Sequence, residues 1–187
     1  MRKKRSSQLL SSLSELSDFP ATRGQYIRMT EGLREITYRL PGRAQALNVP
    51  TYLCAALYAV GLLALLLRHD ARAVRAILVP AACFLVVTVL RPIIGRTRPY
   101  DRFDAPPVGR YTRGKGRSMP SRHAASAAAI ACAVVYAIPG LPMGILMLAM
   151  TLLIASLRVL SGQHYVSDVL AAVALSVLMS LFGYAMV

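Results

Sequence analysis

The sequence is short of acidic residues and of cysteine, and both shortages narrow the possible functions. Only 8 Asp and Glu accompany 22 Lys and Arg in 187 residues, which gives a formal net charge of +14 at pH 7. There are 3 cysteines, an odd number without any C-x-x-C spacing, so they do not predict a disulfide framework. Each lies within an apolar stretch, where a free thiol packs like a small hydrophobic residue. We therefore predict core positions for Cys54, Cys83 and Cys132.

The strong positive charge suggests nucleic acid as a ligand, but its distribution does not. The basic residues fall in the N-terminal segment and between apolar stretches rather than on one soluble face. Membrane topology and anionic lipid headgroups account better for such a distribution. With 56% hydrophobic residues and a mean hydropathy of +0.50, the chain is expected to have a lipid bilayer as its partner and no nucleic acid.

Long apolar stretches fill the sequence after residue 48. A helix needs about 20 mostly apolar residues to cross a hydrocarbon core of roughly 30 Å. The last three of the candidate stretches are rich in Ala, Gly and Ser, which let membrane helices approach closely. The candidates are residues 49–67, 73–94, 122–138, 143–160 and 166–187. This pattern predicts an all-α fold, a polytopic membrane bundle of about five transmembrane helices, in one domain over residues 49–187.

A polar, basic and Ser-rich segment, residues 1–48, precedes this domain. It opens with MRKKR, like the basic region of a signal peptide, yet polar residues follow where the apolar region would begin, so no cleaved signal is expected. Within it, Ile27, Leu33, Ile36 and Leu40 recur at near-helical spacing between basic residues. Two interpretations stay open, a helix lying on anionic lipid and an ordinary solvated helix.

Three clusters of ionisable residues lie at the ends of the predicted spans. They are RPIIGRTRP at 91–99, SMPSRHAAS at 118–126 and RVLSGQHYVSD at 158–168. A charged residue at the centre of a span costs about 2.5 to 3.5 kcal/mol on insertion scales, so ionisable groups collect at span ends. Counting the crossings places all three clusters on the same side of the membrane, whichever side that is. We therefore expect them to form one site.

The third cluster holds a histidine and a carboxylate at a spacing that suits catalysis. His164 and Asp168 are four residues apart, which corresponds to about one helical turn. A carboxylate in that position accepts a hydrogen bond from one ring nitrogen and leaves the other nitrogen with a free lone pair. Such a histidine is a candidate nucleophile.

The other two clusters supply groups for binding an oxyanion and for proton transfer. Arg91 and Arg98, seven residues apart, fall on nearly the same helical face unless Pro92 or Gly95 bends the segment, and two guanidinium groups suit phosphate. In the second cluster, Ser121 follows a proline and precedes the apolar run, so we predict it as the N-cap of a helix whose first amide groups point at the site.

His123 lies in the first turn of the same predicted helix. An imidazole there can supply a proton to a leaving oxygen. The basic loop over residues 100–117 joins the first two clusters, and it is either a gate that attracts an anionic headgroup or a solvated connection that sets topology.

Together the three clusters resemble the type 2 phosphatidic acid phosphatase superfamily of integral membrane lipid phosphatases, which shares its core with the vanadium haloperoxidases. The family pattern is a basic residue, six positions and Arg-Pro, then Pro-Ser-Gly-His, then Arg, five positions, His, three positions and Asp. Residues 91–168 contain all three motifs in this order. The sequence departs from the pattern with Arg91 for a lysine, Arg122 for the motif glycine and Leu157 for a serine.

The resemblance implies a mechanism for these residues. His164 attacks phosphorus and becomes a phosphohistidine, Asp168 orients it, and His123 protonates the leaving group. Neither a metal nor another cofactor is required. The phosphoryl oxygens would be held by Arg91, Arg98, Ser121, Arg122 and Arg158.

The resemblance also implies a lipid substrate, either a phospholipid such as phosphatidylglycerophosphate or phosphatidate, or a polyprenyl phosphate or pyrophosphate. The basic N-terminal segment favours a bacterial cytoplasmic membrane with this segment, and hence the site, on the cytoplasmic face. Arg68 and Arg72 on the opposite side oppose that orientation, and an external site would favour undecaprenyl pyrophosphate. The alternative function is a lipid-phosphate-binding or scaffold protein without catalysis, which would need the arginines but not the histidine–carboxylate pair. The sequence makes no prediction of oligomeric state.

Overall fold

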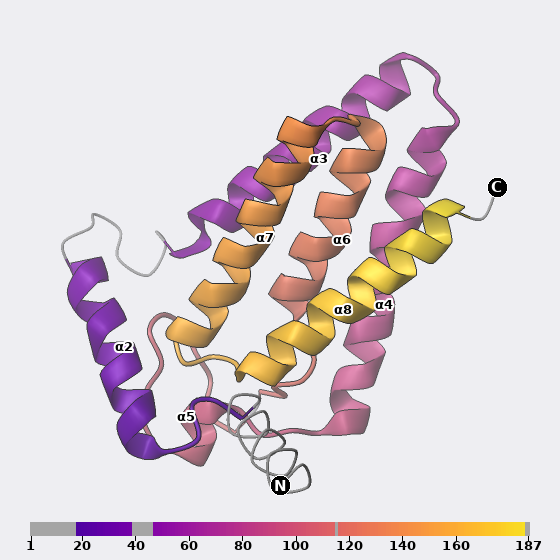
Figure 1. The fold of residues 1–187 in the computed structure, drawn as a ribbon. Coiled ribbons are helices and arrows are strands. Elements are labelled where there is room, and N and C mark those ends of the chain that lie inside the picture. Colours follow the sequence, from indigo (N-terminus) through magenta and orange to yellow (C-terminus); the bar gives the residue numbers. More distant parts are fainter. Residues whose placement is uncertain (1–17, 39–46, 115, 186–187) are drawn as a thin grey trace, which may run out of the picture.

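The computed structural model describes residues 18–38, 47–114 and 116–185, and over these ranges it is helical (Figure 1). The basic start of the chain, with MRKKR, and Leu40 lie outside the described residues. An isolated antiparallel bridge joins Thr97 to Arg117. The helices are α2 (Arg23–Tyr38), α3 (Val49–Leu67), α4 (Arg72–Ile94), α5 (Pro99–Arg102), α6 (Arg122–Ala137), α7 (Leu141–Leu160) and α8 (Val166–Ala185).

The bundle is built around α6. In Figure 1 this helix lies among the long helices, and it packs against α3, α4, α7 and α8. Nearly all of its alanines are buried, among them Ala124, Ala128 and Ala129. Side chains this small let the surrounding helices approach the α6 backbone closely. The core cysteines Cys54 and Cys83 are buried and Cys132 is partly buried, all without disulfides, as predicted.

The helices have the length and surface of membrane spans. Among the described residues, 4 helices, namely α3, α4, α7 and α8, are long and apolar enough to cross a bilayer. Helix α6 has 16 residues, which corresponds to about 24 Å. The outer faces carry exposed large aliphatic side chains such as Leu53, Leu78, Leu152 and Leu178. In water these would be unfavourable, but against lipid acyl chains they are solvated, so the predicted all-α polytopic membrane bundle is confirmed.

One end of the bundle collects all three ionisable clusters. The chain alternates in direction, so the C-terminal ends of α4 and α7 meet the N-terminal ends of α6 and α8, next to α2 and α5 in the lower part of Figure 1. This agrees with the expectation from counting crossings.

The segment after α4 differs from the sequence prediction. Arg91 lies in the last turn of α4, but the helix ends at Ile94. The C-cap residue Gly95 has a left-handed φ of 65° and donates its N–H to the Arg91 carbonyl. Arg98 lies beyond this turn, in extended backbone before α5. The two arginines therefore do not share a helical face, because the glycine turn redirects the chain.

Helix α2 forms where the N-terminal pattern predicts a helix, but its buried face is a different one. Tyr26, Thr30, Leu33 and Thr37 are buried, whereas Ile36 is 66% exposed. The buried face lies against the loops at the site end of the bundle. The hydroxyl of Tyr26 donates to the carbonyl of Ala105 at 3.2 Å.

Candidate functional site

The histidine–carboxylate pair lies at the start of α8. Asp168 is in the first turn of the helix, but His164 precedes the helix in the turn that follows α7, so the pair is not spaced by a helical turn as predicted. His164 Nδ1 nevertheless lies 3.6 Å from Asp168 Oδ2. This is longer than a hydrogen bond, and Nδ1 has no other partner among the described residues. Both side chains are buried, His164 with 1% exposure and Asp168 with none.

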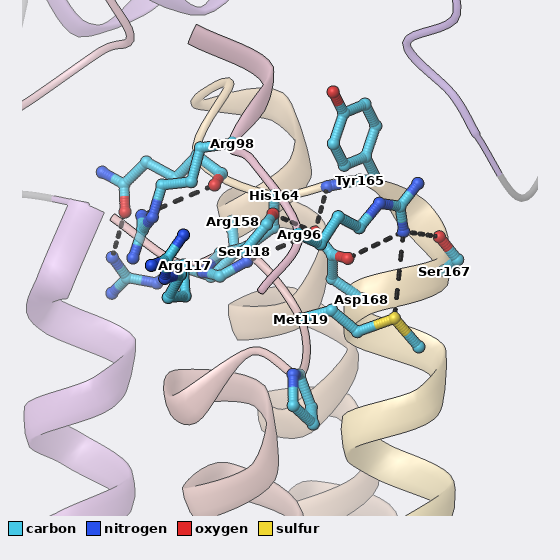
Figure 2. Close-up of polar contacts among 12 residues, drawn as sticks. Arg96, Arg98, Arg117, Ser118, Met119, Arg158, His164, Tyr165, Ser167 and Asp168 are labelled. Atoms are coloured by element: carbon cyan, nitrogen blue, oxygen red, sulfur yellow. Dashed lines mark hydrogen bonds and ion pairs between the residues drawn. The ribbon is translucent and has the colours of Figure 1, made fainter. Parts of the chain in front are cut away.

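Asp168 receives hydrogen bonds from segments that are distant in the sequence (Figure 2). Its Oδ2 accepts from the Ser118 hydroxyl and from the Tyr165 N–H at 2.8 Å. Its Oδ1 accepts from Arg96 Nη1 at 2.9 Å. A carboxylate held by this many donors stays ionised and keeps a fixed orientation, as an acceptor for the histidine requires.

Arg96 is a site residue that the sequence analysis did not select. Besides Asp168, its guanidinium group contacts the hydroxyl of Ser167 at 2.6 Å and the carboxylate of Asp18 at 2.6 Å. It also lies 4.1 Å from the centre of the Tyr165 ring. Its position inside the first basic cluster was the available signal, but sequence alone does not tell which arginine of that cluster reaches the carboxylate. Ser118 and Gln163 lie inside the other two clusters but were not selected, and Asn48 lies outside all three clusters, so no sequence signal pointed to it.

Arg91 supports the backbone of the loop that leads into α6. The side chain is buried, with 5% exposure. Its Nη1 donates to the carbonyl of Pro120 at 2.8 Å, and its Nη2 donates to the carbonyl of Arg117. The guanidinium group of Arg91 thus ties the end of α4 to the residues that immediately precede His123.

Arg98 and Arg158 approach each other at Gln163. Arg98 Nη1 lies 3.5 Å from the Gln163 carbonyl oxygen, and Arg158 Nη1 lies 3.4 Å from the Gln163 side-chain oxygen. Arg158 Nη2 also donates to Asn48 at 2.9 Å. The Nε atoms of both arginines are buried and have no hydrogen-bond partner among the described residues. Buried donors without a partner are unusual, and here two of them come from neighbouring cations, which is typical of a site that receives an anion.

Three cavities meet at His123. One of about 440 Å³ is lined by Arg158, Gln163 and Arg110 together with His123. A second, of about 830 Å³, is lined by Arg98, Gln163, Arg110 and again His123. The third, of about 320 Å³, extends along the bundle and contains Arg122. The His123 side chain is exposed and lines all three cavities.

Ser121 occupies the N-cap position of α6, as predicted, but its side chain does not cap the helix. The hydroxyl is buried and has no partner among the described residues. The Ser121 N–H donates to the carbonyl of Asp168 at 3.1 Å, so the start of α6 is bonded directly to the start of α8.

The electrostatics of the site favour a neutral His164 and an anion beside the neighbouring arginines. Burial, in the first place, lowers the pKa of His164 to about 4, although the contact with Asp168 acts in the opposite direction. Burial also lowers the pKa of Arg98, and the nearby charge of Arg122 contributes to this. His164 thus presents a neutral imidazole at neutral pH, next to cations whose mutual repulsion an anion would relieve. Within the described ranges no group of three or more His, Cys, Asp and Glu is arranged to hold a metal ion.

These features define a polytopic membrane protein that gathers arginines, histidines and a buried carboxylate at one end of its bundle. The family model of the PAP2 superfamily matches residues 72–187, which is more than half of the chain, and the chain belongs to that superfamily. The resemblance found from the three motifs is therefore confirmed.

Solved structures share the fold. One is the first transmembrane PAP2 type phosphatidylglycerolphosphate phosphatase from Bacillus subtilis, with a TM-score of 0.65 and 22% identity over 95% of this chain and 93% of that one. Another is LpxE from Aquifex aeolicus, with a TM-score of 0.52 and 17% identity over 82% of this chain and 93% of that one. No curated protein sequence matches the chain significantly.

The Arg98 side chain occupies space that is open because Gly116 has no side chain. A Cβ atom there would lie 2.5 Å from Arg98 Nε and 2.7 Å from the Tyr100 hydroxyl. We expect Gly116→Ala to displace the guanidinium group and to raise the Kd for inorganic phosphate about tenfold, as for the loss of one charge-assisted hydrogen bond. Isothermal titration calorimetry in detergent measures this. Gly144→Ala is the control, since no atom lies within 4 Å of its new Cβ. An unchanged Kd for Gly116→Ala would contradict the expected role of Arg98.

Removal of Arg96 should leave the charge of Asp168 incompletely compensated. We expect Arg96→Met to lower the free energy of unfolding by about 2 to 3 kcal/mol. In an Asp168→Asn background, Arg96→Met should lower the free energy of unfolding much less, because residue 168 then carries no charge. Denaturant unfolding of the two single variants and the double variant measures this coupling. Equal costs in both backgrounds would show that Arg96 does not act through Asp168.

Proposed function

We propose that this protein is a membrane lipid phosphatase that hydrolyses a phosphate monoester or pyrophosphate of a lipid through a phosphohistidine intermediate. The observation that carries the proposal is the pair of buried Nε atoms of Arg98 and Arg158, which have no hydrogen-bond partner among the described residues, next to the histidine–carboxylate pair. A pocket that only binds phosphate needs the arginines. It does not need His164 turned toward a buried carboxylate.

In the first step, His164 is the nucleophile. Its Nδ1 faces Asp168, so Nε2 carries the lone pair that forms the bond to phosphorus. The bond between phosphorus and the ester or anhydride oxygen breaks as this bond forms. His123, in the cavity, donates its proton to the departing oxygen.

In the second step, water releases the phosphate. His123, now neutral, removes a proton from a water molecule that attacks phosphorus, and the P–N bond to His164 breaks. The products are inorganic phosphate and the dephosphorylated lipid, and both histidines return to their starting state. The same residue acts as acid and then as base, as microscopic reversibility requires.

The arginines stabilise the charge of the transferring phosphoryl group. Arg98 and Arg158 replace their weak contacts with Gln163 by hydrogen bonds to phosphoryl oxygens, with the Ser121 hydroxyl and the first amide groups of α6 as further donors. Arg91 adds positive charge while it holds the loop before α6. No metal ion or other cofactor has a part in this mechanism, in which preorganised donors carry the charge.

We place the protein in a bacterial cytoplasmic membrane with the site on the cytoplasmic face. Helix α2, which carries Arg23, Arg28 and Arg34, lies at the site end of the bundle, so these basic residues are on the side of the site. The positive-inside rule assigns that side to the cytoplasm. A phospholipid substrate agrees with the phosphatidylglycerolphosphate phosphatase named among the structural neighbours, and a polyprenyl phosphate or pyrophosphate is the second class to test.

The His164→Ala variant tests the proposal. Purified wild-type protein in detergent with EDTA should release phosphate from at least one of phosphatidylglycerophosphate, phosphatidate and undecaprenyl pyrophosphate. The variant should lose at least about 10³-fold in kcat, because His164 is the nucleophile of the proposed mechanism. If the wild type binds phosphate but hydrolyses none of these lipids, the result would instead favour a lipid-phosphate-binding or scaffold protein. Turnover retained in the variant would exclude His164 as nucleophile.

The pH dependence of kcat/KM tests the state of His164. The nucleophile must be neutral, and burial lowers its pKa to about 4, so the imidazole remains neutral as the pH falls through 6.5. After correction for the titration of the substrate phosphate, we expect the acid limb due to His164 well below pH 6. Activity that falls as the pH decreases, with an apparent pKa near 6.5, would contradict a buried, neutral nucleophile.

A further inference from the structure

Arg122 stands where the family motif has glycine, and its surroundings differ from those of the other arginines at the site. It is the first residue of α6 and is exposed. No hydrogen bond or ion pair joins its guanidinium group to another residue in the part of the chain that the structure describes. Arg91, Arg98 and Arg158 all contact protein oxygens, so Arg122 is distinct from them.

The side chain lines a cavity of about 320 Å³ whose other walls are mostly apolar. Arg122, Ser126 and Ile130 recur at every fourth residue on one face of α6 and line this cavity together. Cys54, Phe84 and Ile154 from the neighbouring helices complete the walls, together with Thr51, Ala55, His123 and Ala127. The hydroxyl of Thr51 is buried without a partner among the described residues. The cavity thus combines the guanidinium group of Arg122 with apolar walls and the Thr51 hydroxyl.

His123 connects this cavity to the phosphoryl site. It lines the Arg122 cavity as well as the two cavities that contain Arg158 and Arg98. In the proposed reaction His123 protonates the leaving oxygen, so the phosphoryl group lies on the side of the two arginines. The leaving group then extends past His123 into the cavity of Arg122.

The charge of the leaving group decides whether Arg122 has a partner. The alcohol released from a simple phosphate monoester is neutral once His123 has protonated it, and the cavity walls near Arg122 offer a neutral chain only apolar contact. A leaving group that itself carries a phosphate presents oxygens that a guanidinium group binds in bidentate fashion.

We infer that Arg122 binds a second phosphate of the substrate, so that the preferred lipids carry two phosphates, one transferred to His164 and one retained on the product. This rests on the proposed function and specifies its substrate class. Two lipid chemistries meet the requirement. In one the second phosphate is joined directly as a pyrophosphate, and in the other it is a phosphodiester separated by a short alcohol.

The test compares matched pairs of lipids that differ in the second phosphate. The pairs are undecaprenyl pyrophosphate with undecaprenyl phosphate, and phosphatidylglycerophosphate with phosphatidate. For Arg122→Gln we expect kcat/KM to fall about tenfold or more for the two-phosphate member of at least one pair, with less than about a twofold change for its one-phosphate partner. The pair that responds identifies which of the two chemistries Arg122 recognises.

Two further variants control the interpretation. Arg122→Lys keeps the charge without the planar fork and should retain part of the selectivity. Arg75→Gln removes an arginine from the first turn of α4, at the opposite end of the bundle. It should leave unchanged the ratio of the kcat/KM values for the two members of each lipid pair. Thermal unfolding of each variant separates a folding defect from a binding defect.

An equal loss of activity on both members of each pair would overturn the inference, since it would identify Arg122 as a general anchor or structural residue. So would unchanged ratios in a folded Arg122→Gln. Wild-type protein that hydrolyses none of the four lipids would overturn the proposed function itself, whereas turnover lost in His164→Ala with unchanged ratios in Arg122→Gln would overturn this inference alone.

Discussion

The structure depends on keeping one carboxylate charged where water does not reach it. Asp168 is fully buried, and an uncompensated charge there would cost several kcal/mol. Its donors are Arg96 after α4, Ser118 before α6 and the Tyr165 N–H before α8. Satisfying this charge joins the ends of three helices. The same contacts place His164, since it is the immediate neighbour of Tyr165 in the turn that the carboxylate stabilises.

Close helix packing brings the site residues of α6 to the end of the bundle where Asp168 lies. Helix α6 is lined with buried alanines, so the surrounding helices approach it closely. Its first turn bears His123 and Arg122, and its N-cap residue bonds to the carbonyl of Asp168. His123, His164 and the arginines therefore lie at or next to the ends of packed membrane helices, which fixes their relative positions.

Arginines within one short stretch have different surroundings, and these suggest different functions. Arg91 holds backbone carbonyls of the loop before α6, Arg96 neutralises Asp168, and Arg98 retains an unused donor at the cavity. The departures from the family pattern fit this division. Arginine in place of lysine at position 91 reaches two carbonyls at once, which its forked guanidinium group allows. Arginine in place of glycine at position 122 adds a cation in the cavity beyond His123.

The helical membrane bundle could be predicted from sequence because lipid requires long apolar stretches whose backbone groups are paired internally. The motif spacing also pointed to His164, Asp168, Arg91, Arg98 and Arg158, which the structure brings to one end of the bundle. Only the tertiary structure decided how they meet. A turn at Gly95 takes Arg98 off the helix of Arg91, and His164 reaches Asp168 from the turn before α8 rather than along it. The selection of Arg96 among its neighbours also required the fold, because contacts between residues 72 positions apart depend on how the helices pack and leave no period in the sequence.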